Sequence, residues 1–203
     1  MGHCISRIAS FVTLAAVLSL PAAAATTTWQ IDPAHTSANF SVRHLMISTV
    51  RGEFKGVTGT IVWDDQDITK STVSVTIDTT TVTTGEPKRD NDLRTNPDFF
   101  DTAKYPTITF KSSKVEQVAP GKLKVTGALT IRDVTKNDVV LDVEGPSASV
   151  KDPWGNTRSA VSATTKINRR EYGVVWDKKM DNGGVVVSDD VNISIDLEMT
   201  KQK

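Results

Sequence analysis

The sequence predicts an all-β domain in which eight antiparallel strands form a closed or nearly closed barrel, with one short helix near residues 86–95. Three observations support this fold class. Apolar and polar residues alternate with a period of two over most of the chain, which is typical of strands that have one buried face. Clusters of Asp, Asn, Gly and Pro separate these rows, as expected of turns. Helical periodicity is nearly absent outside one segment.

Residues 1–25 have the composition of a secretory leader. Arg7 supplies a positive charge, residues 8–20 are apolar, and residues 21–25 offer small side chains for cleavage. The apolar run is short for a membrane span, although an uncleaved anchor is the alternative interpretation. We therefore expect a cleavable signal peptide over residues 1–25, export to the periplasm, and a folded barrel over residues 26–203.

The expected strands are rows of inward apolar residues that alternate with outward polar ones. In chain order the rows are Phe40/Val42, Ile61/Trp63, Val73/Val75/Ile77, Ile108/Phe110, Leu123/Val125/Gly127/Leu129/Ile131, Val139/Leu141/Val143, Ala163/Thr165/Ile167 and Val191/Ile193/Ile195/Leu197/Met199. The rows run from one end of the chain to the other. Closure into a barrel is favoured over a sandwich because it leaves no unpaired edge strand.

The segment before Ile108 departs from this alternation. Pro87 suits the first turn of a helix, Asp90 and Asp92 favour a helix N-terminus, and Thr84 or Gly85 could cap it. A short helix over residues 86–95 is predicted, with Leu93 as its inward residue. Phe99 and Phe100 are then expected to anchor the chain where it leaves the helix.

Which face of the barrel is apolar needs a separate argument, because outward apolar rows would indicate an outer-membrane barrel. Aromatic residues amount to only 6% of the chain, they form no girdles, and the last strand carries no terminal aromatic. We therefore expect the apolar rows to face inward and the chain not to span a membrane. An eight-stranded barrel can fill its interior or hold one small ligand, and the pattern leaves both alternatives open.

Composition excludes several classes of function. The 24 basic and 24 acidic residues provide no excess positive charge for general nucleic-acid binding. Cys4, the single cysteine, lies in the leader, so no disulfide or thiolate site is expected in the mature domain. His35 and His44 would need a third ligand such as Asp32 or Asp90 and lack metal-binding spacing. No nucleophile elbow or phosphate loop occurs, so no catalytic residue, metal or cofactor is expected.

A set of short motifs resembles a known family. They are Trp29–Ser37, Phe40–His44, Gly52–Phe54, Arg89-Asp90 with Leu93-Arg94, Asp98–Asp101, Tyr105–Ser112, Val125–Ile131 with Val134–Lys136, and Asn168-Arg169 followed by Tyr172-Gly173 and Trp176. Their order and content resemble the YceI-like family of bacterial periplasmic polyisoprenoid-binding proteins. The resemblance implies a lipocalin-like barrel that holds a long isoprenoid or similar lipid, acts as a carrier and not as an enzyme, and can form a homodimer.

The predicted ligand-binding residues combine inward apolar side chains with polar residues at the barrel mouth. They are Phe40, Val42, His44, Val75, Ile77, Arg89, Leu93, Arg94, Phe99, Phe100, Ile108, Phe110, Leu129, Trp176, Ile193 and Ile195. His44 would line or cap the mouth. Arg89 and Arg94 could hold a polar head group, because guanidinium suits phosphate and carboxylate. Ordinary ion pairing of these arginines with Asp90, Asp92 or Asp101 is the alternative.

Two other functions stay open at this point. One is an enzyme that acts on a lipid or another small apolar molecule. The other is a structural or stress-response module whose barrel is filled by its own side chains and has no ligand.

Overall fold

The computed structural model describes residues 26–181 and 183–203, and the expected signal peptide lies outside the described residues. The strands are β1 (Thr26–Ile31), β2 (Ser37–His44), β3 (Ser48–Phe54), β4 (Val57–Asp64), β5 (Thr72–Asp78), β6 (Thr107–Ala119), β7 (Lys122–Ile131), β8 (Val134–Glu144), β9 (Val150–Lys151), β10 (Thr157–Asn168) and β11 (Asp190–Lys201). The helices are α1 (Pro87–Thr95) and three 3-10 turns, η1 (Ile68–Lys70), η2 (Thr79–Thr81) and η3 (Arg169–Tyr172).

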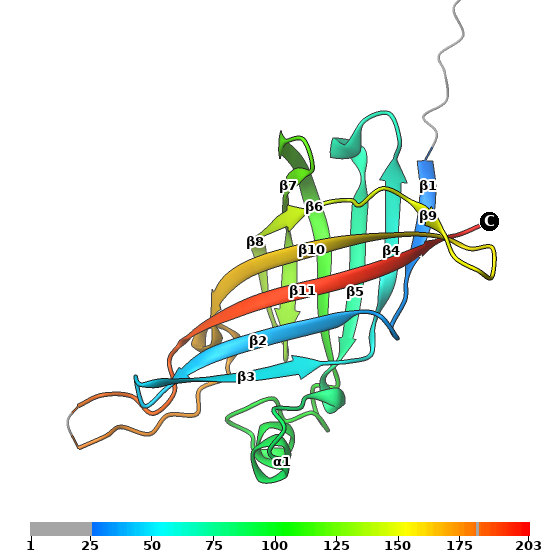
Figure 1. Ribbon diagram of the computed structural model, residues 1–203. Coiled ribbons are helices and arrows are strands. Elements are labelled where there is room, and N and C mark those ends of the chain that lie inside the picture. The colour runs from blue at the N-terminus through cyan, green and yellow to red at the C-terminus, as the bar shows by residue number, and fades with distance from the viewer. Residues whose placement is uncertain (1–25, 182) are drawn as a thin grey trace, which may run out of the picture.

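Eight antiparallel strands close into a barrel, as the sequence predicts. The ring runs β1-β4-β5-β6-β7-β8-β10-β11, and β11 closes it by pairing with β10 on one side and with β1 on the other. In Figure 1, β10 and β11 run diagonally across the front of the more upright β4 to β7. Every ring strand therefore has two neighbours, and the shortest pairing apart from β1–β11 joins β8 to β10 over residues 142–144 and 162–164 alone.

Three further strands extend the wall. β2 pairs with the part of β11 that β1 leaves free, from Asn192 to Asp196, and β3 pairs with β2. β9 adds a short pairing to β10. The predicted row at Phe40 and Val42 therefore belongs to β2, outside the closed ring. The eighth ring strand is β1, which the alternation missed because this short strand has only two buried apolar residues, Trp29 and Ile31.

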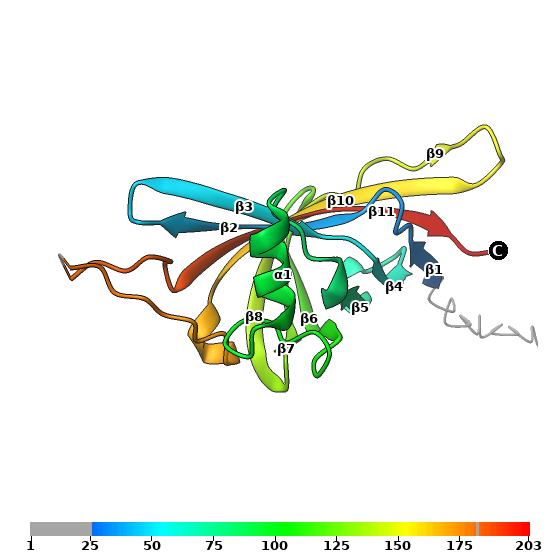
Figure 2. The same cartoon turned by 90° about the horizontal axis from the view of Figure 1, so that it is seen from below.

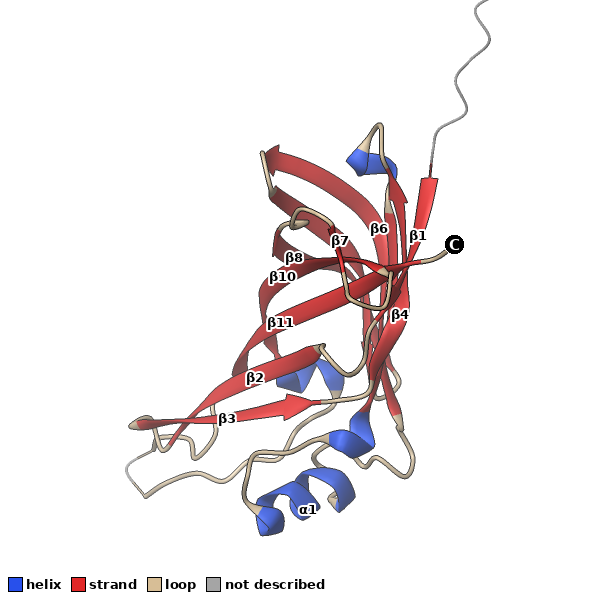
Figure 3. Ribbon diagram, turned by 45° about the vertical axis from the view of Figure 1, so that its right-hand side comes forward, coloured by secondary structure: helices blue, strands red, loops and turns tan. Residues whose placement is uncertain are grey.

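The predicted helix is α1, and it lies at the lower end of the barrel (Figure 3). From below, α1 crosses in front of the strand ends (Figure 2). Pro87 stands in its first turn as expected, but the N-cap is Glu86 and not Thr84 or Gly85. The Glu86 carboxylate accepts hydrogen bonds from the backbone N–H groups of Lys88 and Arg89, which would otherwise lack partners. Within residues 26–181 and 183–203, no helix has the length and apolar character needed to cross a membrane.

The apolar rows face the barrel interior. On β7 the alternation of buried and exposed residues is regular, with Leu123, Val125, Leu129 and Ile131 all buried. Gly127 shares this inward face, and its small size is required. A Cβ atom there would stand 2.5 Å from the carbonyl oxygen of Lys111. The expectation that apolar residues point inward is therefore met by the geometry.

Candidate functional site

The barrel interior contains a cavity of about 250 Å³. Its walls come from the inward rows of β4 to β8, β10 and β11, together with β2 and Phe54 of β3. Nearly all of these lining residues are aliphatic or aromatic. The regular period of two produces this wall, because alternate residues of every strand point to the same side. The site is therefore a consequence of the whole barrel and not of one motif.

The inward row of β11 shows where the barrel is packed and where it is hollow. Leu197 and Met199 are 7% and 0% exposed, so neighbouring side chains pack closely around them at the cavity wall. Ile193 and Ile195 also point inward but remain partly exposed, and they lie opposite β2. Inward side chains that stay accessible face open space and not one another. The structure thus favours a cavity over a barrel filled by its own side chains.

Arg169 is the one charged residue that lines the cavity within the described ranges. It is 5% exposed, and burial lowers the pKa of its guanidinium. Its N–H groups donate to the carbonyl oxygens of Ser188 at 3.0 Å and Val174 at 2.8 Å, and to a carboxylate oxygen of Asp189 at 3.2 Å. Arg169 therefore joins two loop segments of the wall, and its hydrogen-bonding capacity is largely used within the protein.

The lower end of the cavity is closed by α1 and the segment that follows it. Leu93 on α1 is 9% exposed and lines the cavity, as do Phe99 and Phe100. The N–H of Phe100 donates to the carbonyl oxygen of Leu93 at 3.1 Å, which turns the chain back under the barrel. The Phe100 ring meets that of Phe54 on β3 edge-on, with centroids 5.2 Å apart. An aromatic layer thus forms this end of the cavity.

A buried carboxylate attaches α1 to the barrel. Asp90 is 5% exposed and accepts hydrogen bonds from the backbone N–H of Thr84 at 2.7 Å and from the hydroxyls of Thr84 and Thr83. Burial opposes ionisation, but the hydrogen bonds from Thr84 and Thr83 outweigh it and hold the pKa of Asp90 below its usual value. Thr83 in turn exchanges backbone hydrogen bonds with Glu53 on β3.

The two arginines predicted to hold a head group support the same attachment. Arg89 donates from Nε to the hydroxyl of Thr84 at 2.7 Å, and Arg94 donates from Nη1 to the carbonyl oxygen of Val82 at 2.6 Å. Neither guanidinium lines the cavity. Among the residues that the structure describes, neither forms an ion pair with Asp90, Asp92 or Asp101, which the sequence analysis gave as the alternative. Both connect α1 to the segment that precedes it.

Most of the predicted ligand-binding residues line the cavity, namely Phe40, Val42, Val75, Ile77, Leu93, Phe99, Phe100, Ile108, Phe110, Leu129, Ile193 and Ile195. His44, Arg89, Arg94 and Trp176 lie outside it. Contact with a ligand stays a prediction for all of these residues.

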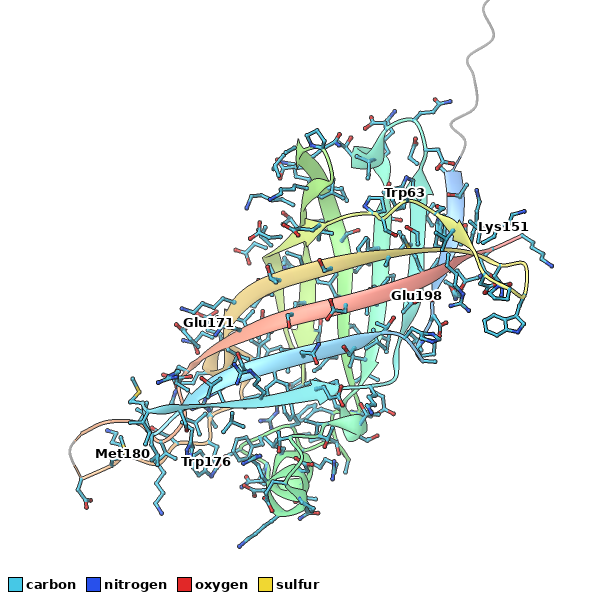
Figure 4. The ribbon with its side chains drawn as sticks, in the orientation of Figure 1. Trp63, Lys151, Glu171, Trp176, Met180 and Glu198 are labelled. Atoms are coloured by element: carbon cyan, nitrogen blue, oxygen red, sulfur yellow. The ribbon has the colours of Figure 1, made fainter. Side chains whose placement is uncertain are left out.

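Trp176 and His44 occupy the surroundings of the cavity. The Trp176 ring stacks on that of Phe99, with centroids 5.4 Å apart and planes 17° from parallel, so it supports a lining residue. Figure 4 shows Trp176 at the lower left of the molecule. His44 ends β2, two residues beyond Val42, and forms a bridge with Val187, which also lines the cavity. It therefore lies just past the end of the lining on this strand.

Several lining residues were not among those predicted. Trp63 belongs to the alternating row Ile61/Trp63, so the sequence could have predicted that it lines the cavity. Tyr172, Val174 and Val187 lie in segments without alternation, and no local signal reveals them. Tyr172 is 2% exposed, and burial raises the pKa of its phenol to about 12. Only the folding of the 169–189 region against the barrel brings these three to the wall.

A separate charged cluster lies around Arg158 on β10. Its guanidinium contacts Asp152 at 2.7 Å, Asp32 at 2.6 Å and Glu198 at 2.5 Å, and His35 bonds Asp32 at 3.0 Å. Arg158, followed by His35, lowers the pKa of Asp32 to about 2. Asp32, His35 and Glu198 place potential metal-ligand atoms within 4.8 Å of one another. Arg158 already supplies the positive charge that these carboxylates bind. Of the two histidines that the sequence analysis considered as metal ligands, His35 belongs to this cluster and His44 does not.

The family of the chain follows from comparison with known proteins. The sequence model of the YceI-like domain matches residues 29–199, which is nearly the whole described barrel. This chain belongs to the YceI-like family. Protein YceI of Escherichia coli O157:H7 is 34% identical over 194 residues, covering 95% of this chain and 96% of that protein.

Solved structures show the same YceI-like barrel. BcnA of Burkholderia cenocepacia superposes with a TM-score of 0.69 at 22% identity, over 83% of this chain and 98% of BcnA. A domain of Saccharophagus degradans, described as a polyisoprenoid binding domain implicated in plant cell wall breakdown, gives a TM-score of 0.61 at 18% identity over 86% of this chain and 98% of that domain. At these identities the two structures establish the lipocalin-like fold, which confirms the predicted fold class.

Proposed function

We propose that this chain is a periplasmic carrier that holds the chain of a long apolar lipid, a polyisoprenoid, inside its barrel. The observation that carries the proposal is the cavity itself, whose inward residues remain accessible within a closed barrel. Its lining offers apolar contacts along its length and no free charge, since Arg169 is bonded to the protein. The polyisoprenoid binding described for the Saccharophagus degradans domain, which has the same fold, is consistent with this ligand class.

The affinity would come from burying the lipid chain. Each buried methylene contributes about 0.8 kcal/mol, so ten buried carbons would supply about 8 kcal/mol before the cost of ordering the chain. A charged head group would gain nothing from the aliphatic wall, because an unpaired charge is costly to bury. We therefore expect the apolar chain to lie inside and the polar end to remain at an opening of the barrel.

The first test is the lipid content of the protein. The chain should be expressed with its leader, purified from the periplasmic fraction, and extracted with organic solvent for mass spectrometry. We expect a stoichiometric isoprenoid in the extract. Fatty acids would retain a lipid carrier but contradict the isoprenoid class, and an empty extract from folded protein would contradict the function. Recovery of the protein only in the cytoplasm, with residues 1–25 retained, would contradict export.

A pair of adjacent substitutions on β11 tests the site. Ile195→Arg places a charge in the cavity, whereas Ser194→Arg places the same side chain on the exposed outer face. We expect Ile195→Arg to lose the bound lipid and Ser194→Arg to keep it. Circular dichroism and thermal unfolding establish that both variants fold. If folded Ile195→Arg still purifies with its lipid, the cavity is not the binding site.

A further inference from the structure

The hairpin of β2 and β3 ends in an exposed apolar tip formed by Leu45, Met46 and Ile47. Met46 is 56% exposed and Ile47 is 77% exposed. Leu45 and Met46 have φ values of 51° and 63°, in the left-handed region that favours Gly, Asn or Asp. Large apolar residues are therefore unfavourable here both for the turn and for solvation. This choice of residues is understandable if the tip contacts something apolar.

A second hairpin, from Lys178 to Val186, lies against this apolar tip. The N–H of Leu45 donates to the carbonyl oxygen of Val186 at 2.8 Å, and Lys179 forms a bridge with Val185. Both hairpins project to the same side of the barrel at its lower left in Figure 1. Met180 lies on the second hairpin, near its projecting end (Figure 4). The two hairpins thus form one protruding surface.

The charges around the apolar tip are mainly positive. Arg43 is exposed, and its guanidinium donates to the carbonyl oxygen of Met46 at 3.0 Å. Lys178 and Lys179 are exposed and form no ion pair with any residue that the structure describes. Two acidic residues lie near these lysines. Asp177, just before the second hairpin, forms an ion pair with Arg170 at 2.8 Å. Asp181, on the second hairpin, forms no ion pair with any residue that the structure describes.

The inner surface of the barrel continues toward the apolar tip. Phe40 and Val42 on β2 line the cavity, and His44 and the apolar tip follow them along the same chain. On the neighbouring segment Val187 lines the cavity, and Val186 bonds Leu45. The tip also projects from the side of the barrel where β2, and not β1, pairs with β11. A lipid leaving a bilayer at the tip would therefore meet the hollow region of the barrel.

We propose that the apolar tip docks on a bilayer surface that carries anionic head groups. Met46 and Ile47 would enter the boundary between head groups and acyl chains, while Arg43, Lys178 and Lys179 would contact the anionic lipids. In this position the protein exchanges its ligand with the membrane at the β2 side of the barrel. The exchange rests on the proposed lipid-carrier function, whereas the docking can be measured independently of it.

The test is sedimentation of the purified mature protein with vesicles. One set contains phosphatidylcholine alone, and the other contains equal amounts of phosphatidylcholine and phosphatidylglycerol. We expect binding to the anionic vesicles, with a loss of at least about tenfold in the Met46→Ser/Ile47→Ser double variant. Lys178→Gln/Lys179→Gln should weaken binding by a similar factor at low salt and remove most of its salt dependence.

Trp154→Ser is the matched control, because Trp154 is an apolar residue that is 80% exposed in a turn of the β9–β10 hairpin. We expect this variant to bind vesicles as the unmodified protein does. Equal binding by the Met46→Ser/Ile47→Ser variant overturns the proposal. The proposal is also overturned if no form of the protein binds vesicles. A third refuting result is a dimeric protein that binds no vesicles and becomes monomeric in the Met46→Ser/Ile47→Ser variant, which would assign the tip to contact with a second copy.

The lipid content of the same samples separates the two proposals. A Met46→Ser/Ile47→Ser variant that keeps its lipid but loses vesicle binding supports docking and leaves the cavity intact. Protein that carries lipid but ignores anionic vesicles refutes the docking alone. Protein that carries no lipid refutes the carrier function, and the vesicle result then still decides whether the tip binds membranes.

Discussion

Replacement of Asp90 by asparagine should loosen α1 and open the lower end of the cavity. The carboxylate accepts hydrogen bonds from Thr83 at 2.9 Å, from the N–H of Thr84 at 2.7 Å and from the Thr84 hydroxyl. An amide keeps one acceptor oxygen and has no charge. A hydrogen bond to a charged group contributes about 1.5–3 kcal/mol. Loss of one such bond, about 2 kcal/mol, would raise the population with α1 detached about thirtyfold.

Amide hydrogen exchange measures this opening directly. The backbone N–H groups of position 90, Asn96 and Phe100 are bonded within the α1 region, to Glu86, Asp92 and Leu93, and should exchange about thirtyfold faster in Asp90→Asn. The amides of β7 and β10 should keep their protection, which separates opening of α1 from global unfolding. Release of a bound lipid should accelerate with the same variant.

Asp92→Asn is the control on the same helix. Asp92 is exposed, and its carboxylate accepts from the side-chain amide of Asn96 at 3.1 Å. Its replacement should change exchange by less than about threefold. The attachment of α1 through Asp90 would be refuted if Asp90→Asn exchanged no faster than Asp92→Asn.

The same region should respond to acid. The pKa of Asp90 is held below its usual value in the folded protein, since hydrogen bonds from Thr84 and Thr83 outweigh the effect of burial. Its contribution is therefore complete above the unfolded value of about 3.9 and is lost as the pH falls through the lower folded value. Exchange of the α1 amides should accelerate in that range for the unmodified protein and less so for Asp90→Asn.

Three further predictions concern other parts of the barrel. Arg158→Met should raise the pKa of Asp32 from about 2 toward its usual 3.8, because its main cation is lost, and carbon-detected NMR titration of that carboxyl would show it; an unchanged titration would contradict the assigned cause. Gly127→Val should lower the free energy of unfolding in urea by about 1–3 kcal/mol, because a Cβ there would stand 2.6 Å from Cζ of Phe110; equal stability would show that the wall can yield. Trp176→Ala should weaken lipid affinity less than Phe99→Ala, since Trp176 only stacks on Phe99, which lines the cavity; the reverse order in a fluorescence titration would place Trp176 in the site.

The regularity of the strands explains how much could be predicted locally. The inward rows of β5, β7 and β11 follow from alternation, because a period of two sends every second side chain to one face whatever lies on it. α1 was also predictable, from Pro87 and the acids that follow it. β1 and the 169–189 segment were less accessible to this reasoning. β1 completes the ring by pairing with β4 and β11, and residues of the 169–189 segment reach the cavity by packing against the barrel. Both depend on distant parts of the chain, which no local pattern records.

The chemistry of the arginines shows the same division. Arg89 and Arg94 are well suited to anionic groups, and the sequence left open whether a ligand or the protein would use them. The structure directs both to the segment Val82–Thr84 that anchors α1. A guanidinium bonds whichever acceptor the fold brings within reach, and those acceptors are backbone and hydroxyl oxygens that the sequence alone does not position.

By itself, the sequence determined an all-β barrel with its apolar face inward and the family to which it belongs. These properties depend on short-range alternation and on the order of motifs along the chain. Only the tertiary structure decided that the barrel is hollow, that α1 closes its lower end, and that apolar residues and cations meet at one tip. A cavity is the volume that opposing strands fail to fill, so it depends on the distances between walls that residues far apart in the chain create together.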